Sequence, residues 1–477
     1  MTDEEYTKSL ESLLKETVNS ASFQNQQAQI NAWRLSPSFD KTFRELEIYG
    51  TINTLISISC ILLSCGDNSC ATDTLKICAR ILENISQFST KSLDNDYIKI
   101  ISAMCYDLAG YQANAFCVSK TISDYKFEKF DSNGSKLTED NFIIEQFVLI
   151  LQKRIVLARK RLEEADFTHT ENFRILYNAL HKWYSKILFL EESNYLNLIT
   201  KAYRKYLFSN NIYISNLLQL LKTKIYISEK RNLKNLIKES IGDLNQIWEK
   251  YLKLLANDVY DKSSVKKDEQ KHSLYELWVS QINAINQGLL QQHESFVVQM
   301  PTSAGKTFIA ELFILNNLIK NPDKHVVYIS PFKALSTEKE NDLGNHLEKL
   351  GYSVSVLPGS YEMDFFFQEL FPVETDVLIA TPEKTDLLLR TKKEYFKNVS
   401  VIIIDEGHLI GDEGTRGVLL EFLIIRLKIL YPEIQYLFIS AVMSEDNSQE
   451  LACWLSNNDS HVITSSFNGK IGSPHRN

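Results

Sequence analysis

Phosphate-binding chemistry is indicated by the stretch that follows the apolar run Phe296–Met300. Its residues are Pro301, Thr302, Ser303, Ala304, Gly305, Lys306 and Thr307. An amphipathic run from Phe308 to Ile319 comes next, so the order predicts a strand, a tight loop and a helix. Unpaired backbone N–H groups and the dipole at the start of a helix favour an anion there. We therefore predict that this loop binds the phosphates of a nucleotide.

Three residues of the loop have separate predicted roles. Gly305 lets the backbone approach the phosphates closely, Lys306 reaches the terminal phosphates, and the Thr307 hydroxyl holds Mg²⁺. The predicted cofactors are therefore ATP and Mg²⁺. Because so short a motif also occurs by chance, an ordinary turn between a strand and a helix is the alternative.

Two adjacent acids follow a second apolar run, Ile402–Ile404. Asp405 is expected to hold Mg²⁺, directly or through water, and Glu406 to orient and deprotonate the attacking water. Neighbouring carboxylates repel each other unless a cation lies between them, so this pair indicates a cation site. A polar turn at a strand end is the alternative. His408 is expected either to link the ATP site to a neighbouring domain or to cap the turn.

Strands must position these residues, and the sequence after residue 274 predicts a parallel sheet. Short, nearly uniformly apolar runs alternate there with helical stretches; the runs are Phe296–Met300, His325–Ser330, Ser353–Leu357, Asp376–Ala380, Val401–Ile404, Gln435–Ser440 and His461–Thr464. Strands that are buried on both faces of a parallel sheet have such uniformly apolar sequences. Right-handed crossovers bring the carboxyl ends of such strands to one edge, where ligands bind. We predict an α/β domain over 274–470 and a tail over 471–477.

The N-terminal half contains few helix breakers. Of the nine prolines, only Pro37 precedes Pro301. We predict an all-α region over 1–265, with a possible split near 131–139, where Asp131–Ser135 is polar. Residues 266–273 are polar and are predicted to be a linker.

Composition restricts the class of protein. The net charge is −8 and the isoelectric point is near 5.7, which argues against nucleic-acid binding by bulk charge but allows a local basic groove. Two basic clusters either contact a phosphate backbone or, as we favour, lie on solvated helix faces. Their residues are Lys153, Arg154, Arg159, Lys160, Arg161, Lys222, Lys224, Lys230, Arg231, Lys234 and Lys238.

The sequence also bears on location. The acidic start lacks the pattern of a signal peptide, and the longest apolar run, Leu55–Cys65, is too short to cross a bilayer. Seven cysteines without a secretory signal predict reduced thiols and a cytoplasmic protein, with no membrane partner. The cluster Cys60, Cys65, Cys70 and Cys78 is interpreted as core residues rather than as a metal site.

The motifs resemble those of superfamily 2 helicases of the DExH-box type, most closely the branch with the superkiller and Brr-type RNA helicases and their archaeal DNA relatives. Pro301–Thr307 is similar to the first motif of that branch, and Asp405–His408 to its Asp-Glu-x-His box. The continuation Leu409–Gly417 is also similar. The resemblance implies a RecA-like fold for 274–470 and does not cover the N-terminal region.

Further stretches carry the same resemblance. Gln281 is placed like the glutamine that reads adenine in this family, and Ser440-Ala441-Val442 stands where the family has Ser-Ala-Thr. By resemblance, His408 and Ser440 couple ATP hydrolysis to strand movement, and Val442 lacks the hydroxyl used for this. The nucleic-acid contacts that the resemblance implies are Pro331, Lys333, Gly359, Thr381, Pro382 and Glu383.

Two hypotheses of different classes follow. The first is the N-terminal part of an ATP-dependent helicase that steps 3′ to 5′ along single-stranded RNA or DNA. No second RecA-like lobe and no arginine finger are recognised, so we expect the other lobe to be lost or supplied by a second chain. The second hypothesis is an ATP-binding interaction module with little turnover. A P-loop ATPase unrelated to nucleic acid is disfavoured, because the stretches around Pro331–Lys333 and Thr381–Glu383 resemble motifs that contact a nucleic-acid backbone.

Overall fold

The chain consists of two units. In the computed structural model, the helical unit comprises Met1–Asn232 and Lys253–Glu276, and the sheet unit comprises Leu233–Leu252 and Leu277–Asn477. The residues that the structure describes are 3–35, 45–87, 92–122, 139–164, 170–209, 211–260, 271–291, 294–300, 305–357, 375–410, 415–441, 445–456 and 462–464. Predictions for 131–135, Pro301–Ala304, Gly359, Val442 and the tail 471–477 lie outside these residues.

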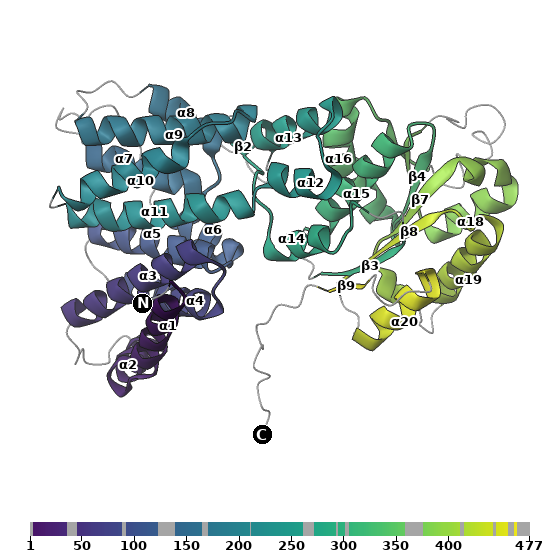
Figure 1. Ribbon diagram of the computed structural model, residues 1–477. Helices are drawn as coiled ribbons and strands as arrows, with labels where there is room; N and C mark the ends of the chain where they lie inside the picture. The colour runs from purple at the N-terminus through teal and green to yellow at the C-terminus, as the bar shows by residue number, and fades with distance from the viewer. Residues whose placement is uncertain are drawn as a thin grey trace. The chain divides into compact units, whose positions relative to one another are not determined.

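The helical unit confirms the prediction of an all-α N-terminal region. Its helices, labelled in Figure 1, are α1 (Asp3–Asn19), α2 (Ala21–Leu35), α3 (Glu45–Cys65), α4 (Ser69–Ser86), α5 (Ser92–Leu108), α6 (Gln112–Lys120), α7 (Glu139–Leu151), α8 (Ile155–Glu163), α9 (Glu171–Phe189), α10 (Tyr195–Leu207) and α11 (Ile212–Lys230). A short antiparallel pair, β1 (Val259–Tyr260) and β2 (Lys271–His272), follows. One core of buried apolar side chains, among them Phe147, Trp183 and Leu217, runs through the helices.

Helix α3 is longer than the apolar run that the sequence suggested. Among the residues that the structure describes, its window Ile48–Cys65 is the one segment long and apolar enough to cross a membrane, and half of that window is buried in the protein. Its side chains, including Ile52 and Leu55, belong to the core of the helical unit. The burial is that of a core helix.

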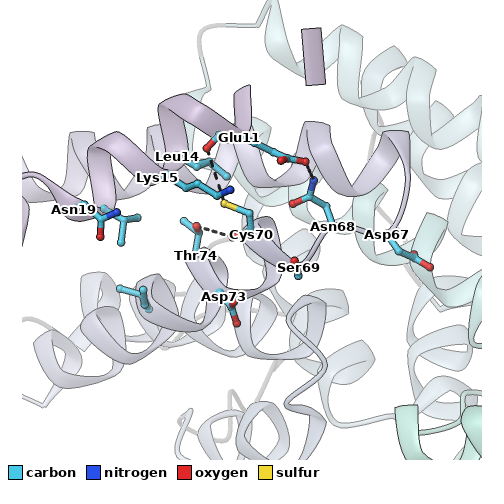
Figure 2. Close-up of a pocket in the computed structure, with 12 residues that line it drawn as sticks. Glu11, Leu14, Lys15, Asn19, Asp67, Asn68, Ser69, Cys70, Asp73 and Thr74 are labelled. Atoms are coloured by element: carbon cyan, nitrogen blue, oxygen red, sulfur yellow. Dashed lines mark hydrogen bonds between the residues drawn. The ribbon is translucent and has the colours of Figure 1, made fainter. Parts of the chain in front are cut away.

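Helices α1 and α4 line an open hollow with both polar and apolar side chains, and Figure 2 shows Glu11, Lys15 and Thr74 in its lining. Asn68 caps α4 by accepting a hydrogen bond of 2.9 Å from the Ala71 N–H, and its amide donates to Glu11 Oε1 at 2.5 Å.

The cysteine cluster is divided between the core and the surface. Cys60 and Cys78 are buried in the helical core, and burial raises the pKa of each thiol to about 12. Cys65 is exposed, so the interpretation as core residues does not hold for all four.

The prediction of a solvated helix face is wrong for Lys224. Its side chain is only 3% exposed, and its ammonium lies 2.7 Å from Asp107 Oδ2 and 2.5 Å from Glu276 Oε2. Ser228 also donates a hydrogen bond to Glu276. A buried lysine needs such partners, because an isolated charge inside a protein is costly. Lys224 therefore belongs to the interior of the helical unit rather than to a solvated face.

The sheet unit confirms the predicted α/β class. Within the described residues, parallel strands form one seven-stranded sheet in the order β5-β6-β4-β7-β8-β3-β9. The strands are β3 (Phe296–Gln299), β4 (His325–Ile329), β5 (Val354–Val356), β6 (Val377–Ala380), β7 (Val399–Ile404), β8 (Gln435–Ser440) and β9 (Val462–Thr464). All seven predicted runs are strands, because an apolar run without alternation suits a strand covered on both faces.

Helices cover both faces of the sheet. The helices of this unit are α12 (Leu233–Ile241), the first half of α13 (Gln246–Asp258), α14 (Val279–Asn286), α15 (Lys306–Lys320), α16 (Lys333–Leu350), α18 (Pro382–Thr391), α19 (Thr415–Leu430) and α20 (Glu445–Ser456). Figure 1 shows α18, α19 and α20 on one face, with α15 and α16 on the other. Ile402 and Ile404 point to the α18–α20 side, so Ile403 points to the α15 side.

Candidate functional site

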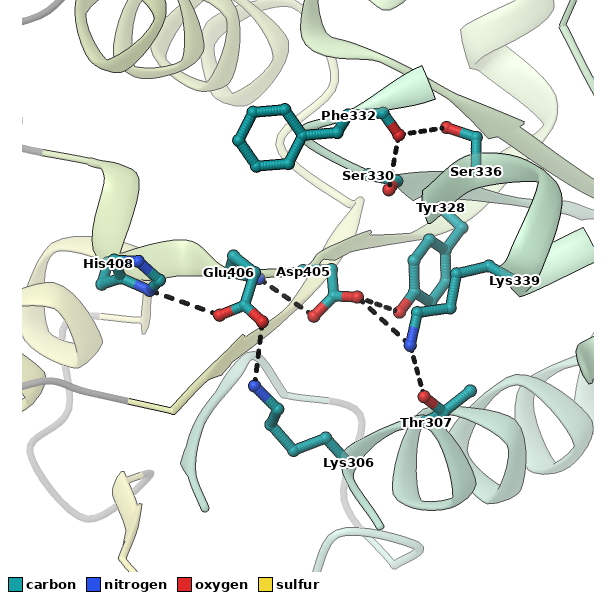
Figure 3. Close-up of polar contacts among 10 residues, drawn as sticks. All are labelled: Lys306, Thr307, Tyr328, Ser330, Phe332, Ser336, Lys339, Asp405, Glu406 and His408. Atoms are coloured by element: carbon teal, nitrogen blue, oxygen red, sulfur yellow. Dashed lines mark hydrogen bonds and ion pairs between the residues drawn. The ribbon is translucent and has the colours of Figure 1, made fainter. Parts of the chain in front are cut away.

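The carboxyl edge of the sheet brings the two predicted chemical motifs together. β3 leads to the loop before α15, and β7 ends directly before Asp405. β7 lies beside β4, with Ile404 paired to Ile329, and the Asp405 N–H donates to the Ile329 carbonyl at 3.0 Å. Figure 3 shows that Lys306 and Glu406 consequently meet, although 100 residues separate them in the sequence.

Glu406 has two basic neighbours. Its Oε1 lies 3.1 Å from Lys306 Nζ, and its Oε2 lies 3.4 Å from His408 Nδ1. The Ser440 hydroxyl lies 3.3 Å from the same nitrogen of His408. The structure therefore brings together His408 and Ser440, the two residues with a predicted coupling role, beside the predicted catalytic carboxylate.

Asp405 is held by partners that the sequence did not reveal. The Tyr328 hydroxyl donates to Asp405 Oδ2 at 2.8 Å, and the Lys339 ammonium lies 3.5 Å from the same oxygen. Lys339 also donates to the hydroxyl of Thr307. Burial, together with the carboxylate of Asp405, raises the pKa of Tyr328 well above its usual value. The contacts of Lys339 were not predicted, because the residues around a lysine in the middle of a helix do not indicate which distant side chains it meets.

The oxygens of Thr307 and Asp405 fit a magnesium ion. A hydroxyl and a carboxylate are hard oxygen ligands, which Mg²⁺ prefers, and both contact one cation, the Lys339 ammonium. Asp405 is 5% exposed, so its carboxylate is largely shielded from water and favours a cation partner. The repulsion expected between Asp405 and Glu406 is relieved here by two lysines, one for each carboxylate.

The backbone at both motifs adopts left-handed conformations. Gly305, immediately before α15, has φ +77°, and a Cβ there would lie 2.4 Å from Gln281 Nε2. The left-handed conformation favours glycine here, whereas the end of the flexible Gln281 side chain could move away from a Cβ. Glu406 has φ +50° and ψ +47°, which costs a non-glycine residue about 1–2 kcal/mol. Such strain is often found at functional sites.

Gln281 approaches the phosphate loop from α14. Its side chain is 6% exposed, and its Oε1 accepts a hydrogen bond of 3.0 Å from the Trp278 N–H. The amide nitrogen faces Gly305, as the clash distance at that glycine indicates. Gln281 thus lies beside the predicted nucleotide loop, and its role in reading adenine stays a prediction.

The predicted nucleic-acid contacts differ in accessibility. Pro331, Thr381 and Pro382 are buried, and Thr381 and Pro382 form the start of α18. Glu383 is exposed, but its carboxylate would repel a phosphate, and it pairs with Arg416 at 3.0 Å. The guanidinium of Arg416 lies 5.4 Å from the centre of the exposed Phe332 ring.

Arg416 is thus a cation at this edge. Arg416 lies in the stretch Leu409–Gly417 that resembles the helicase family, but the sequence did not predict it as a nucleic-acid contact. Lys333 is the first residue of α16, and its contact role stays a prediction.

Comparison with known families decides the nature of the sheet unit. Residues 278–451 match the model of the DEAD/DEAH box helicase family. These residues form a superfamily 2 helicase domain. The predicted phosphate loop, the acidic pair and the glutamine all fall within the matched range. The match does not distinguish the branches of this superfamily, so the narrower resemblance to the superkiller and Brr branch stays a prediction.

Several curated proteins are similar to the chain. The Hachiman protein HamB of Bacillus cereus is 27% identical over 395 residues, which is 82% of this chain and 33% of that protein. The ATP-dependent DNA helicase Hel308 of Methanocaldococcus jannaschii is 37% identical over 186 residues, which is 38% of this chain and 15% of that protein. The HamB match is longer than the helicase domain and extends into the helical unit. The chain spans a third or less of the length of these relatives.

A solved structure is also similar. The helicase Lhr of Mycobacterium smegmatis, bound to ssDNA and AMP-PNP, has 24% identity and a TM-score of 0.33, over 39% of this chain and 25% of that chain.

Proposed function

We propose that this chain is the ATP-binding part of a nucleic-acid helicase. The observation that supports this proposal most strongly is that four residues meet at the carboxyl edge of one parallel sheet: Lys306, Thr307, Asp405 and Glu406. A chance Gly-Lys-Thr sequence would not bring a lysine within 3.1 Å of an acid 100 residues away at the edge where such folds bind ligands. The match of residues 278–451 to the helicase family model supports the same class of protein.

Each residue has one proposed role. Lys306 and the start of α15 bind the phosphates, while Thr307 and Asp405 hold the metal. Glu406 orients the attacking water and accepts its proton, and Lys306, 3.1 Å away, holds this carboxylate in place before the substrate arrives. Mg²⁺, when bound, neutralises charge on the phosphates. His408 and Ser440 are proposed to relay the state of Glu406 to β8.

The proposed substrate is a single strand of DNA or RNA at the edge formed by Phe332 and Arg416. The relatives named as DNA helicases favour DNA as the first substrate to test. We also propose that hydrolysis needs a second RecA-like lobe, because a phosphoryl-transfer site of this kind gains about 10³–10⁵ in rate from an arginine finger. The superkiller and Brr branch and a cytoplasmic location remain part of the proposal.

The test is ATP turnover and fluorescent-ATP binding by the purified chain, with and without single-stranded DNA and RNA. Lys306→Ala is expected to abolish both signals, and Lys349→Ala, an exposed lysine on α16, serves as the matched control. Glu406→Gln is expected to bind ATP but to lose turnover, since the amide cannot accept the proton. Wild-type chain that binds no ATP under any of these conditions would refute the proposal.

One outcome is shared by the proposed function and its alternative. ATP binding that depends on Lys306, with no turnover with either nucleic acid, would point to an ATP-binding interaction module or to a second lobe on another chain. Adding candidate partner chains that restore turnover would then distinguish the two.

A further inference from the structure

Lys339 supplies a positive charge at the point where the two predicted metal ligands meet. Its ammonium lies 3.5 Å from Asp405 Oδ2 and is hydrogen-bonded to the Thr307 hydroxyl, as Figure 3 shows. The Lys339 side chain is 15% exposed and that of Asp405 is 5% exposed. Water therefore screens this pair only weakly, and the charge of Lys339 is strongly felt by anything bound between the two oxygens.

We propose that Lys339 is a built-in counter-ion that competes with Mg²⁺ for Thr307 and Asp405. A divalent ion held by both oxygens would lie within a few ångströms of the ammonium, and like charges at that distance repel strongly. Lys339 must therefore leave before the metal is fully bound. The inference rests on the proposed function, because it concerns the metal that accompanies the nucleotide, but the Mg²⁺ competition can be measured without any nucleotide.

The helix that carries Lys339 begins at the predicted nucleic-acid edge. α16 starts at Lys333, six residues earlier, which corresponds to about 1.7 helical turns. Its first turn is fixed to Phe332, whose carbonyl accepts hydrogen bonds from Ser336 at 3.2 Å and from Ser330 at 3.5 Å. Tyr328, which holds Asp405, lies on the strand that leads into this turn.

A strand bound at the start of α16 can therefore shift Lys339 with the helix. We infer that nucleic acid weakens the competition, so that the metal binds more readily when a substrate is present. Because binding free energies are reciprocal, Mg²⁺-nucleotide would strengthen nucleic-acid binding by the same factor. This route does not involve position 442, where the family's coupling hydroxyl is replaced by Val442.

The first experiment uses Mg²⁺ alone. Thermal unfolding of the full chain is followed in EDTA and in increasing MgCl₂ for wild type, Lys339→Met, Lys339→Gln and the exposed control Lys349→Met. Both Lys339 variants are expected to gain melting temperature with Mg²⁺, because Asp405 then lacks its ammonium and the metal replaces it. Wild type and Lys349→Met are expected to respond at Mg²⁺ concentrations about tenfold higher, a typical coupling between two sites.

The second experiment measures the Mg²⁺ concentration that gives half-maximal binding of a fluorescent AMP-PNP analogue, with and without oligo-dT or oligo-rU. Wild type is expected to need less Mg²⁺ when an oligonucleotide is bound, and Lys339→Met to be insensitive to it. Equal Mg²⁺ responses of wild type and both Lys339 variants in the first experiment would overturn the competition. An oligonucleotide effect that persists in Lys339→Met would overturn the route through α16.

The two proposals fail in different ways. If no variant binds the nucleotide, the proposed function is refuted, and the Mg²⁺ response alone still decides the competition. If Lys339→Met needs more Mg²⁺ than wild type, Lys339 helps to hold the metal site in shape, and the competition is wrong. If Lys339→Met does not fold, Lys339→Gln, which keeps a donor for Thr307 but carries no charge, provides the same comparison.

Discussion

Replacing Lys224 by methionine tests the buried ion network of the helical unit. Lys224 lies 2.7 Å from Asp107 Oδ2 and 2.5 Å from Glu276 Oε2, and all three side chains are less than a tenth exposed. Burial by itself would raise the pKa of Asp107, but Lys224 and Arg231 outweigh it and lower that pKa. Lys224→Met keeps most of the length of the side chain and removes the charge together with the hydrogen bond to Glu276. We expect the helical unit to become much less stable.

The magnitude follows from what the two carboxylates can do without the lysine. At an effective dielectric constant of about 20, opposite charges about 2.6 Å apart attract by roughly 6 kcal/mol, opposed by the several kcal/mol that burying each ion costs. A carboxylate left unpaired escapes by binding a proton. From an unfolded-state pKa of about 4, this protonation costs roughly 4 kcal/mol at pH 7, since each pKa unit is about 1.4 kcal/mol. Arg231 remains near Asp107 and Lys153 remains near both carboxylates, so no more than one such protonation is expected.

The expected loss is therefore about 4 kcal/mol at pH 7 and about 1–2 kcal/mol at pH 5, near the 3–5 kcal/mol typical of breaking a buried pair. The sign follows from linkage: the variant's folded state holds an extra proton, so its stability falls as pH rises above the unfolded-state pKa. The assay is urea unfolding followed by hydrogen exchange of α11 peptides, which separates the helical unit from the sheet unit.

Two comparisons make the prediction refutable. Lys230→Met, on the same helix, breaks the exposed pair with Asp67 and a cation–π contact with Tyr226, and is expected to cost less than about 1 kcal/mol. Combining Lys224→Met with Asp107→Asn and Glu276→Gln removes the unpaired charges and is expected to recover a large part of the loss. A loss that is the same at both pH values, or that the triple variant does not reduce, would show that packing rather than charge is responsible.

Two further predictions concern single buried positions. Burial outweighs the nearby Arg161 and raises the pKa of Glu145 from its ordinary 4.5 to about 7. The stability of the wild-type protein should therefore fall as the pH rises from about 4.5 to about 7. Glu145→Gln is expected to stabilise the helical unit by about 1–3 kcal/mol at pH 8 and little near pH 4.5, measured by thermal unfolding at both; an equal effect at both would contradict the assignment. A Cβ at Gly407 would lie 2.9 Å from the buried ring of Phe438, so Gly407→Ala is expected to cost the sheet unit about 1–3 kcal/mol in urea unfolding. Phe438→Leu should recover part of that loss, and no loss at all would mean that the turn after β7 can shift.

Much of the candidate site could be predicted because its chemistry is local in sequence. Gly305, Lys306 and Thr307 are consecutive, as are Asp405 and Glu406, and each group directly follows an apolar run. In a parallel sheet the carboxyl ends of all strands lie at one edge, so strand ends far apart in the sequence meet there. The predicted meeting of Lys306 with the acidic pair needed no knowledge of side-chain packing.

Burial of Lys224 was partly readable from the sequence. Leu217, Leu221, Lys224 and Ser228 follow the i, i+4, i+7, i+11 spacing of one helix face, and all four are buried in the structure. That spacing indicates that Lys224 points inward. It does not indicate which acids meet it, because Asp107 and Glu276 lie on distant segments. Periodicity therefore determined the direction of the side chain, and the tertiary structure decided its partners.

The sequence by itself determined the seven strands, and it placed Gly305–Thr307 of the predicted phosphate loop and the acidic pair directly after two of them, since apolar runs and backbone geometry act over a few residues. Only the tertiary structure decided that Lys339 contacts Thr307 and Asp405, that Tyr328 holds Asp405, and that Leu233–Leu252 belongs to the sheet unit. These contacts join elements whose separation in sequence is unrelated to their distance in space. The charge balance of the site depends on such contacts, so it is a property of the fold rather than of any motif.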